Sequence, residues 1–476
     1  MMRSLFSGVS GLKNHQTRMD VIGNNISNVN TTGFKSSRVN FADSLSQTLT
    51  SASAANGTLA GTNPKQIGLG SVMSSIDVNF KDGSVQSTGL NTDLCLSGNA
   101  LFIVQQGNQT YYTRNGAFLF DADGNFVNSD GLYVQGFMNN SVTEHDAINT
   151  NGGISNITVR AGKSMPSAQT ESIDYINNLN ASTPTIESMT VTASDGSTSS
   201  PTEATIDGTN NVSAVLTLSD GTNLTVTSGT YTVGHSVPIS TTVNVYDSLG
   251  AKHVVPVTVE KTGADKWLAK LSGATYPTSG DPYLKITEDD GTTTTITMTD
   301  TTIPFTSEGA FDTSTGGTGT MKLTYTNGAA DQSVTVTYAN LTQYANSSTI
   351  NAEADGYAAG TLESVSIDKS GIVYGTYTNG VLRQEAQIAV AQFTNASGLT
   401  KNGNSLYLES QNSGTPNVGT SSGFGVTITA SALEMSNVDV ANEFSDMIIT
   451  QRGFQSNSKI ITVSDELLET LINMKR

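Results

Sequence analysis

Residues 432–474 read ALEMSNVDVANEFSDMIITQRGFQSNSKIITVSDELLETLINM. Large apolar residues recur along this stretch every seven positions, at Leu433, Val440, Met447, Phe454, Ile461 and Leu468. A seven-residue repeat is close to the 3.5-residue period with which one helix face meets a partner helix. We therefore predict one helix over 432–474, roughly 60 Å long at about 1.5 Å per residue. Gly453 lies inside it, and we expect this glycine to allow a bend or a close helix approach rather than to end the helix.

The N-terminal residues carry a second apolar stripe with the same repeat, and the turn residues 30–33 are expected to end that helix. Two striped helices at opposite ends of one chain predict a coiled-coil-like pair. A helix lying on a membrane is disfavoured, because neither polar face is rich in Lys and Arg. The residues expected to form the assembly core are Leu5, Leu12, Met19, Ile22, Ile26, Leu433, Val440, Met447, Phe454, Ile461 and Leu468.

Between the two ends the pattern changes to short apolar runs, such as 101–104 and 117–120. Asn-Gly and Asp-Gly pairs, for example at 115–116 and 123–124, punctuate these runs. Such pairs supply the positive φ angles that tight hairpins require. The sequence therefore predicts an α+β fold, with long N- and C-terminal α-helices pairing in a coiled-coil-like core and nested antiparallel β domains between them.

The domain boundaries follow from the changes of pattern and composition. Two stretches rich in Ser, Thr, Asn and Gly show neither the apolar repeat of a helix nor the alternation of a strand, and we expect them to be linkers. The expected boundaries are 1–30 and 432–476 for a discontinuous helical domain, 31–75 and 403–431 for the linkers, 76–145 and 346–402 for a discontinuous inner β domain, and 146–345 for an inserted outer β domain.

The composition argues against several classes of partner. Lys and Arg number 23 and Asp and Glu number 41, which gives a formal net charge of −18. Nucleic-acid backbones and anionic lipid surfaces repel such a chain, so we expect neither nucleic-acid binding nor membrane insertion. No apolar run reaches the roughly 18 residues of a membrane helix. The N-terminus lacks the apolar core of a cleavable signal peptide, which predicts export by another route.

No constellation of residues points to catalysis or to a cofactor. The four histidines are His15, His145, His235 and His253, and none has a second ligand at metal spacing. Residues 121–125 faintly resemble a calcium loop, but the glycine comes at the fourth position, so a hairpin turn is the better interpretation. The single cysteine, Cys95, excludes an intrachain disulfide and is expected to be a small buried residue. We predict no catalytic, cofactor-binding or metal site.

Both ends of the chain resemble the axial rod and hook proteins of the bacterial flagellum. Residues 10–12 and 21–35 look like the N-terminal signature of that family, and residues 432–439 and 451–459 look like its C-terminal signature. These motifs are long and specific. The signature residues are Asn24, Asn25, Asn28, Thr32, Gly33, Phe34, Asn437, Val438, Gln451, Arg452, Gln455 and Asn457.

Internal passages bring the resemblance closer to the hook subunits than to the rod subunits. Residues 245–253, 355–360 and 375–380 are similar to passages of hook proteins. Rod subunits are shorter and lack an insertion as large as 146–345. The resemblance does not extend to 183–234, which is consistent with an added subdomain.

The resemblance implies a structural subunit of the flagellar hook and not an enzyme. Such subunits polymerise into a flexible curved tube, a universal joint that transmits motor torque to the filament, with the terminal helices in its core. The implied partners are other copies of the chain, the distal rod, hook cap and hook–filament junction proteins, and the flagellar type III export apparatus. The implied location is extracellular, in the hook of the basal body–hook complex.

Other interpretations compete with this one. Another axial subunit, such as the distal rod protein, shares the signatures but not the large insertion. A β-rich surface adhesin shares the acidic charge and the threonine content, yet it is expected to carry its coiled coil in one stretch beside an anchor. A hydrolase is the third interpretation, and a screen on glycans or peptides would reveal it.

Overall fold

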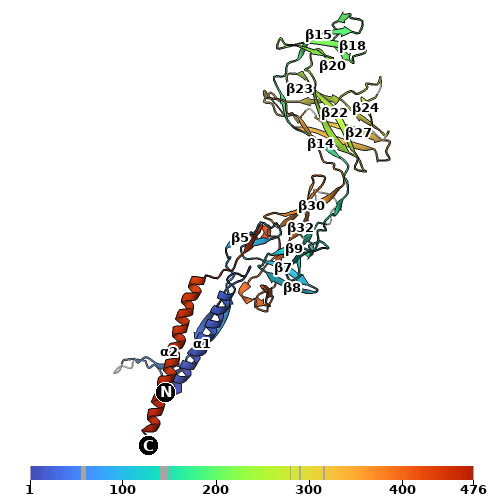
Figure 1. The fold of residues 1–476 in the computed structure, drawn as a ribbon. Coiled ribbons are helices and arrows are strands. Elements are labelled where there is room, and N and C mark those ends of the chain that lie inside the picture. The colour runs from blue at the N-terminus through green and yellow to red at the C-terminus, as the bar shows by residue number, and fades with distance from the viewer. Residues whose placement is uncertain are drawn as a thin grey trace. The chain divides into compact units, whose positions relative to one another are not determined.

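The computed structural model describes residues 2–54, 60–139, 148–150, 152–278, 280–288, 291–314 and 317–474. The described chain consists mostly of β-strands, with a long helix near each end (Figure 1). It divides into two compact units. Unit 1 comprises Met1–Lys163 and Leu362–Arg476, and unit 2 comprises Ser164–Thr361. The cuts fall at 163/164 and 361/362, whereas the sequence analysis expected the insertion to span 146–345.

Both long helices belong to unit 1. α1 covers Met2–Ser27 and α2 covers Val440–Asn473. α2 begins where Asp439 caps it, because the Asp439 carboxylate accepts hydrogen bonds from the backbone N–H groups of Ala441 and Asn442. These donors have no partner within the helix, so the cap stabilises its first turn.

The predicted start of the C-terminal helix is wrong. Ala432–Glu434 forms strand β38, which pairs with β5 (Val85–Ser87), so Leu433 lies on a strand. The seven-residue spacing from Leu433 to Val440 is coincidental, because the Asp439 cap separates the strand from the helix. The helical part of the C-terminus is therefore eight residues shorter at its start than expected.

The main sheet of unit 1 runs in the order β30-β31-β32-β11-β7-β8-β35-β34. Strand β7 is buried on both faces, because Phe102 and Val104 belong to one apolar cluster and Leu101 and Ile103 to another. The strands of unit 1 are β1 (Ser37–Asp43), β2 (Ser46–Thr50), β3 (Lys65–Gly68), β4 (Ser71–Val78), β5, β6 (Leu94–Ser97), β7 (Leu101–Gln106), β8 (Gln109–Thr113), β9 (Phe118–Phe120), β10 (Phe126–Asn128), β11 (Tyr133–Met138), β12 (Ser155–Asn156), β30 (Gly360–Ile367, whose first two residues fall in unit 2), β31 (Ile372–Tyr377), β32 (Leu382–Ile388), β33 (Val390–Gln392), β34 (Thr400–Lys401), β35 (Leu406–Leu408), β36 (Asn417–Gly419), β37 (Thr427–Ala430) and β38.

The two stretches expected to be linkers contain paired strands. In 31–75, β1 pairs antiparallel with β4 and β2 with β3. This segment contacts α1, where the side-chain amide of Asn14 donates to Ser71 Oγ at 2.7 Å. In 403–431, β35, β36 and β37 join the sheets of unit 1. Strands β35 and β36 have only three residues each, too few to show an alternation of apolar and polar residues. In the β2–β3 pair every residue is exposed, so no alternation is expected there.

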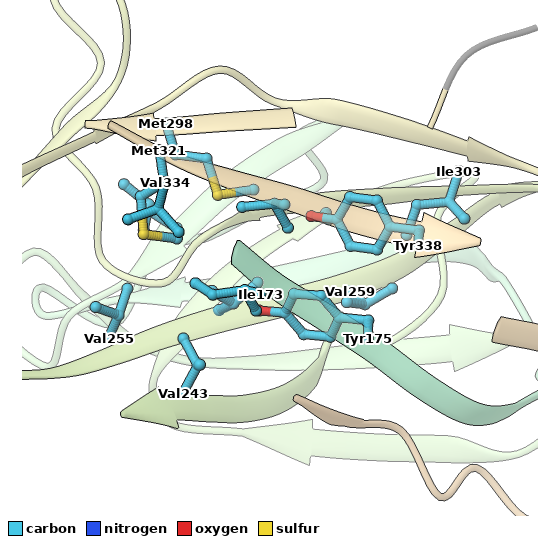
Figure 2. Packing of buried hydrophobic residues seen from close by; sticks show 14 of the residues in the cluster. Ile173, Tyr175, Val243, Val255, Val259, Met298, Ile303, Met321, Val334 and Tyr338 are labelled. Atoms are coloured by element: carbon cyan, nitrogen blue, oxygen red, sulfur yellow. The ribbon is translucent and has the colours of Figure 1, made fainter. Parts of the chain in front are cut away.

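Unit 2 contains a six-stranded sheet, in the order β24-β25-β27-β28-β14-β29, and a four-stranded sheet, in the order β21-β22-β23-β26. Side chains of both sheets share one apolar core, in which Val255 and Val259 lie with Met321 and Val334 (Figure 2). We call these two sheets the sandwich of unit 2. β14 pairs with β28 in parallel, whereas the sequence analysis expected antiparallel pairing.

A second, smaller core lies in the part expected to be a subdomain. Sheet β16-β15-β18-β19 and the pair β17-β20 surround Met189, Val191 and Leu216. Thr185 and Ser236 form an antiparallel bridge, so the chain enters and leaves this part at neighbouring points. The strands of unit 2 are β13 (Ser164–Met165), β14 (Ser172–Asn180), β15 (Ile186–Ala193), β16 (Thr198–Ser199), β17 (Glu203–Ile206), β18 (Asn211–Leu218), β19 (Asn223–Val226), β20 (Gly229–Thr232), β21 (Ile239–Tyr246), β22 (Lys252–Gly263), β23 (Lys266–Leu271), β24 (Tyr283–Thr287), β25 (Thr293–Met298), β26 (Thr301–Pro304), β27 (Thr318–Tyr325), β28 (Gln332–Tyr344) and β29 (Asn351–Ala354).

Candidate assembly surface

The helices α1 and α2 lie side by side and run in opposite directions (Figure 1). Arg18 Nη2 on α1 is 3.0 Å from Asp446 Oδ2 on α2. Further along α1, the side-chain amide of Asn25 donates to Glu443 Oε1 at 2.9 Å. The two ends of the chain therefore meet within one molecule.

The helix pair buries only part of the predicted assembly core. Ile22 is 4% exposed, whereas Val440 and Phe454 are 36% and 39% exposed. Because the apolar side chains of the stripe are not all covered within one chain, the pair leaves apolar surface for further contacts. The half-buried members are Leu5, Leu12, Met19, Ile26, Leu433, Met447, Ile461 and Leu468.

α2 carries further large apolar side chains, which lie outside the seven-residue repeat. They are between 41% and 61% exposed, and four of them follow one another at helical spacing along the C-terminal half. In that half, α2 continues past the N-terminal end of α1 (Figure 1). We call these side chains the exposed α2 residues: Phe444, Ile448, Ile449, Ile460, Val463, Leu467 and Leu471.

The N-terminal signature residues lie where α1 joins the β part of unit 1. Asn25 is buried; its side-chain amide donates to the Ser37 carbonyl at 2.8 Å and its Oδ1 accepts from the Ser37 N–H at 3.0 Å. Asn24, Asn28 and Phe34 contribute to the lining of a pocket of about 500 Å³. The signature therefore fixes the path of the chain out of the helix.

The turn after α1 depends on a glycine. Gly33 has φ +66°, and a β-carbon there would lie 2.5 Å from the backbone nitrogen of Asn115. A side chain at this position is excluded by both the conformation and the space. Next to it, Thr32 donates through Oγ1 to Asn115 Oδ1 at 3.1 Å, and the Phe34 ring lies 4.8 Å from Lys401 Nζ.

The C-terminal signature residues divide into two groups. Asn437 connects segments, because its Oδ1 accepts from the Ser36 N–H at 2.8 Å and its amide donates to the carbonyls of Asn79 and Lys81. Asn457 lies against Gly11 of α1. The remaining members lie on the surface of unit 1, with Val438 half-buried and the side chains of Gln451, Arg452 and Gln455 exposed.

A buried ionic cluster holds the start of the β part to strand β38. Lys35 Nζ is 2.6 Å from Glu434 Oε1, and Arg114 Nη1 is 3.2 Å from Glu434 Oε2 and 3.2 Å from Asp82 Oδ1. Burial lowers the pKa of Lys35, and the Arg114 charge lowers it further. Burial also raises the pKa of nearby Cys95 to about 11. Sequence reasoning missed this cluster, because its members are far apart along the chain.

The structure describes the loop at 121–125 and three of the four histidines that the sequence analysis considered as possible ligands. Within the described ranges, no group of three or more His, Cys, Asp or Glu side chains could hold a metal ion. Asp121 instead accepts hydrogen bonds from the backbone of Asp123 and Asn125, as a turn residue does. His145 lies outside the described residues. No described helix is long and apolar enough to span a membrane.

Four family models match successive parts of the chain. The "Flagella basal body rod protein" model matches residues 5–35, and the "Flagellar hook protein FlgE/F/G D1 domain" model matches residues 95–164. The "Flagellar basal body protein FlaE D2 domain" model matches residues 220–357. The "Flagellar basal body rod FlgEFG protein C-terminal" model matches residues 429–474. Both chain ends and both units thus contain flagellar domains.

Curated relatives match over the whole chain. The flagellar hook protein FlgE of Treponema pallidum is 37% identical, and that of Borreliella burgdorferi is 36% identical, each with 100% of both chains covered. The flagellar basal-body rod protein FlgG of Bacillus subtilis is 29% identical, with 100% of both chains covered. The chain belongs to the family of flagellar hook proteins and is a structural subunit of the hook.

Proposed function

We propose that copies of this chain polymerise into a flexible, curved tube in which α1 and α2 form a coiled-coil-like core. The exposed α2 residues are the observation that carries this proposal. Removing one large apolar side chain from water contributes about 1.5–3 kcal/mol. Several such side chains on one helix would stabilise every subunit contact around the core of a tube.

The same proposal assigns the torque-transmitting flexibility to the β domains, as outer layers of the tube. Charged residues are only 13% of the chain, so we expect neutral polar side chains to form most of the surface of these domains. Contacts between such surfaces lack strong, directional ion pairs. They would therefore slide more easily than the apolar contacts of the core while motor torque passes to the filament.

We further propose the partners and the route of export. The tube would contact the distal rod protein at one end and the hook cap, later the hook–filament junction proteins, at the other. The subunit would leave the cell unfolded through the flagellar type III export apparatus. The single cysteine is compatible with that route, since no intrachain disulfide can form before export.

A pair of substitutions at Ile448 tests assembly. Ile448 is 58% exposed, so Ile448→Asp leaves the folded chain intact but places a charge where a neighbouring copy would bury it. We expect this variant to keep its β-structure by circular dichroism and to form no tubes by electron microscopy. Ile448→Leu keeps the apolar contact and should form tubes normally. Normal tubes from Ile448→Asp would contradict the proposal.

A further inference from the structure

Two matched contacts lie between α1 and α2. Gly11 on α1 faces Asn457 on α2, and a β-carbon at Gly11 would lie 2.7 Å from Asn457 Nδ2. Gly453 on α2 faces His15 on α1, and a β-carbon at Gly453 would lie 2.6 Å from the His15 ring. We call these two contacts the glycine notches. In each notch, a large polar side chain of one helix occupies the space that a glycine of the other helix leaves.

The glycine notches have the same spacing on both helices. Gly11 and His15 are four residues apart on α1, and Gly453 and Asn457 are four residues apart on α2. Residues at this spacing lie on one helix face, one turn apart. The residue numbers of both facing pairs add up to 468, so the two notches belong to one antiparallel register.

We propose that the glycine notches fix the register of α1 against α2 and thereby set the position of the exposed α2 residues for assembly. This inference rests on the proposed function. A slip of one helix turn in one direction would bring His15 against Asn457, where two large side chains collide. A slip in the other direction would bring Gly11 opposite Gly453 and leave a void, which forfeits packing contacts. Only the observed register places a large side chain against a glycine at both points.

Two polar contacts also lie between the helices. The Asn25–Glu443 hydrogen bond has the same register, since 25 and 443 add up to 468, but it lies at the C-terminal end of α1 and leaves the rest of the pair to other contacts. Arg18 and Asp446 are 32% and 48% exposed, and an ion pair with that exposure contributes little. His15 Nδ1 is buried, and it has no hydrogen-bond partner within the part of the chain that the structure describes. Shape, rather than hydrogen bonding through this atom, therefore positions the His15 ring against Gly453. His15, Asn457 and the two glycines are positioning residues for the helix pair.

Substitutions in the notch formed by His15 and Gly453 test the proposal. Gly453→Ala places a methyl group in the space of the His15 ring, and we expect the yield of tubes to fall roughly tenfold. Alanine is the better helix former, so a loss cannot come from helix propensity. His15→Ala combined with Gly453→Ala sets alanine against alanine, and we expect this double variant to recover tubes to within about twofold.

Gly23→Ala is the matched control, because Gly23 also lies on α1 but a β-carbon there would meet nothing within 4 Å. We expect this variant to form tubes like the unchanged chain. Equal yields from Gly453→Ala and Gly23→Ala would overturn the proposal. A double variant no better than Gly453→Ala alone would overturn it as well.

Disulfide crosslinking reads the register directly, both in the soluble chain and in tubes, after the native cysteine is replaced by alanine. Gly8→Cys with Ile461→Cys reports the observed register, since a β-carbon at Gly8 would lie 3.4 Å from Ile461 Cγ1. Gly8→Cys with Ser464→Cys reports a slip by one turn. We expect only the first pair to crosslink, and the second to appear when His15→Ala and Asn457→Ala are added.

The crosslinks separate the two proposals. Slipped crosslinks at full yield with both notches intact would overturn the role of the notches, while tube formation by the same chain would leave the proposed function standing. A chain that crosslinks in the observed register but never forms tubes would support the notches and contradict the proposed function.

Discussion

The buried carboxylate of Glu434 is the centre of a set of contacts that join three segments of unit 1. It accepts from Lys35 Nζ at 2.6 Å, from Arg114 Nη1 at 3.2 Å and from the Gly83 N–H at 2.8 Å, and its side chain is fully buried. These partners come from three separate segments of the chain. A single residue thus connects the exit from α1, the β part and strand β38.

Glu434→Gln should therefore destabilise unit 1 strongly. The substitution leaves Lys35 without its buried carboxylate and Arg114 with only the partly exposed Asp82, a change that typically costs about 3–5 kcal/mol. Urea unfolding of the full chain, followed by circular dichroism, measures the loss. Arg38→Gln is the control, because Arg38 is 76% exposed and 4.0 Å from Asp77, so we expect a change below about 1 kcal/mol. Equal losses from both variants would contradict this assignment.

Cys95 should be inert in the folded chain. Burial raises the pKa of its thiol to about 11, and the charge of Glu434 adds to the rise. The thiolate is the reactive form, and an exposed cysteine with a pKa near 8.5 already forms it at mildly basic pH. We expect iodoacetamide at a pH of about 8.5 to label the chain only in denaturant. Rapid labelling of the native chain, read by mass spectrometry, would show that Cys95 is accessible.

At the scale of single residues, the sequence showed which residues have a structural role better than it showed which residues contact each other. It selected Asn25, Gly33 and Asn437 through a resemblance, and the structure gives each a specific contact. It could not pair Lys35 with Glu434, which are 399 residues apart. Such a pair depends on the path of the whole chain, which no local pattern contains.

The helices were the elements that the sequence predicted best, because a seven-residue repeat reports local geometry directly. The start of α2 was missed, because the cap at Asp439 and the pairing of β38 with β5 override the repeat. Strands in the expected linkers were missed for a different reason. β35 and β36 have three residues each, too few to show an alternation.

The C-terminal end of α2 should gain protection when the chain assembles. Leu467 and Leu471 are each 51% exposed, and an isolated helix end with few packing contacts opens readily. We expect the backbone amides of 467–473 to exchange rapidly in the soluble chain and slowly in tubes. Hydrogen exchange with mass spectrometry measures both states. Equally slow exchange in the two states would show that a neighbouring copy does not order this segment.

For the whole molecule, the sequence predicted a β-rich chain between terminal helices but not its sheet topology. The parallel pairing of β14 with β28 brings 172–180 beside 332–344. Between these segments the chain forms the smaller core and most of the sandwich strands. Both strands alternate between buried and less buried residues, but this alternation does not record the direction in which they pair. Hairpin signals alone therefore favoured antiparallel neighbours throughout.

The smaller core of unit 2 should be removable without loss of the tube. Its apolar residues form a cluster separate from that of the sandwich, and Thr185 and Ser236 already form a bridge at its base. Replacing 186–235 by a short glycine turn should therefore leave the sandwich folded. We expect near-normal tubes, with altered curvature or stiffness because outer contacts are fewer, by circular dichroism and electron microscopy. If this deletion abolished tubes while Ile448→Asp did not, the roles assigned to the helices and to the β domains would have to be exchanged.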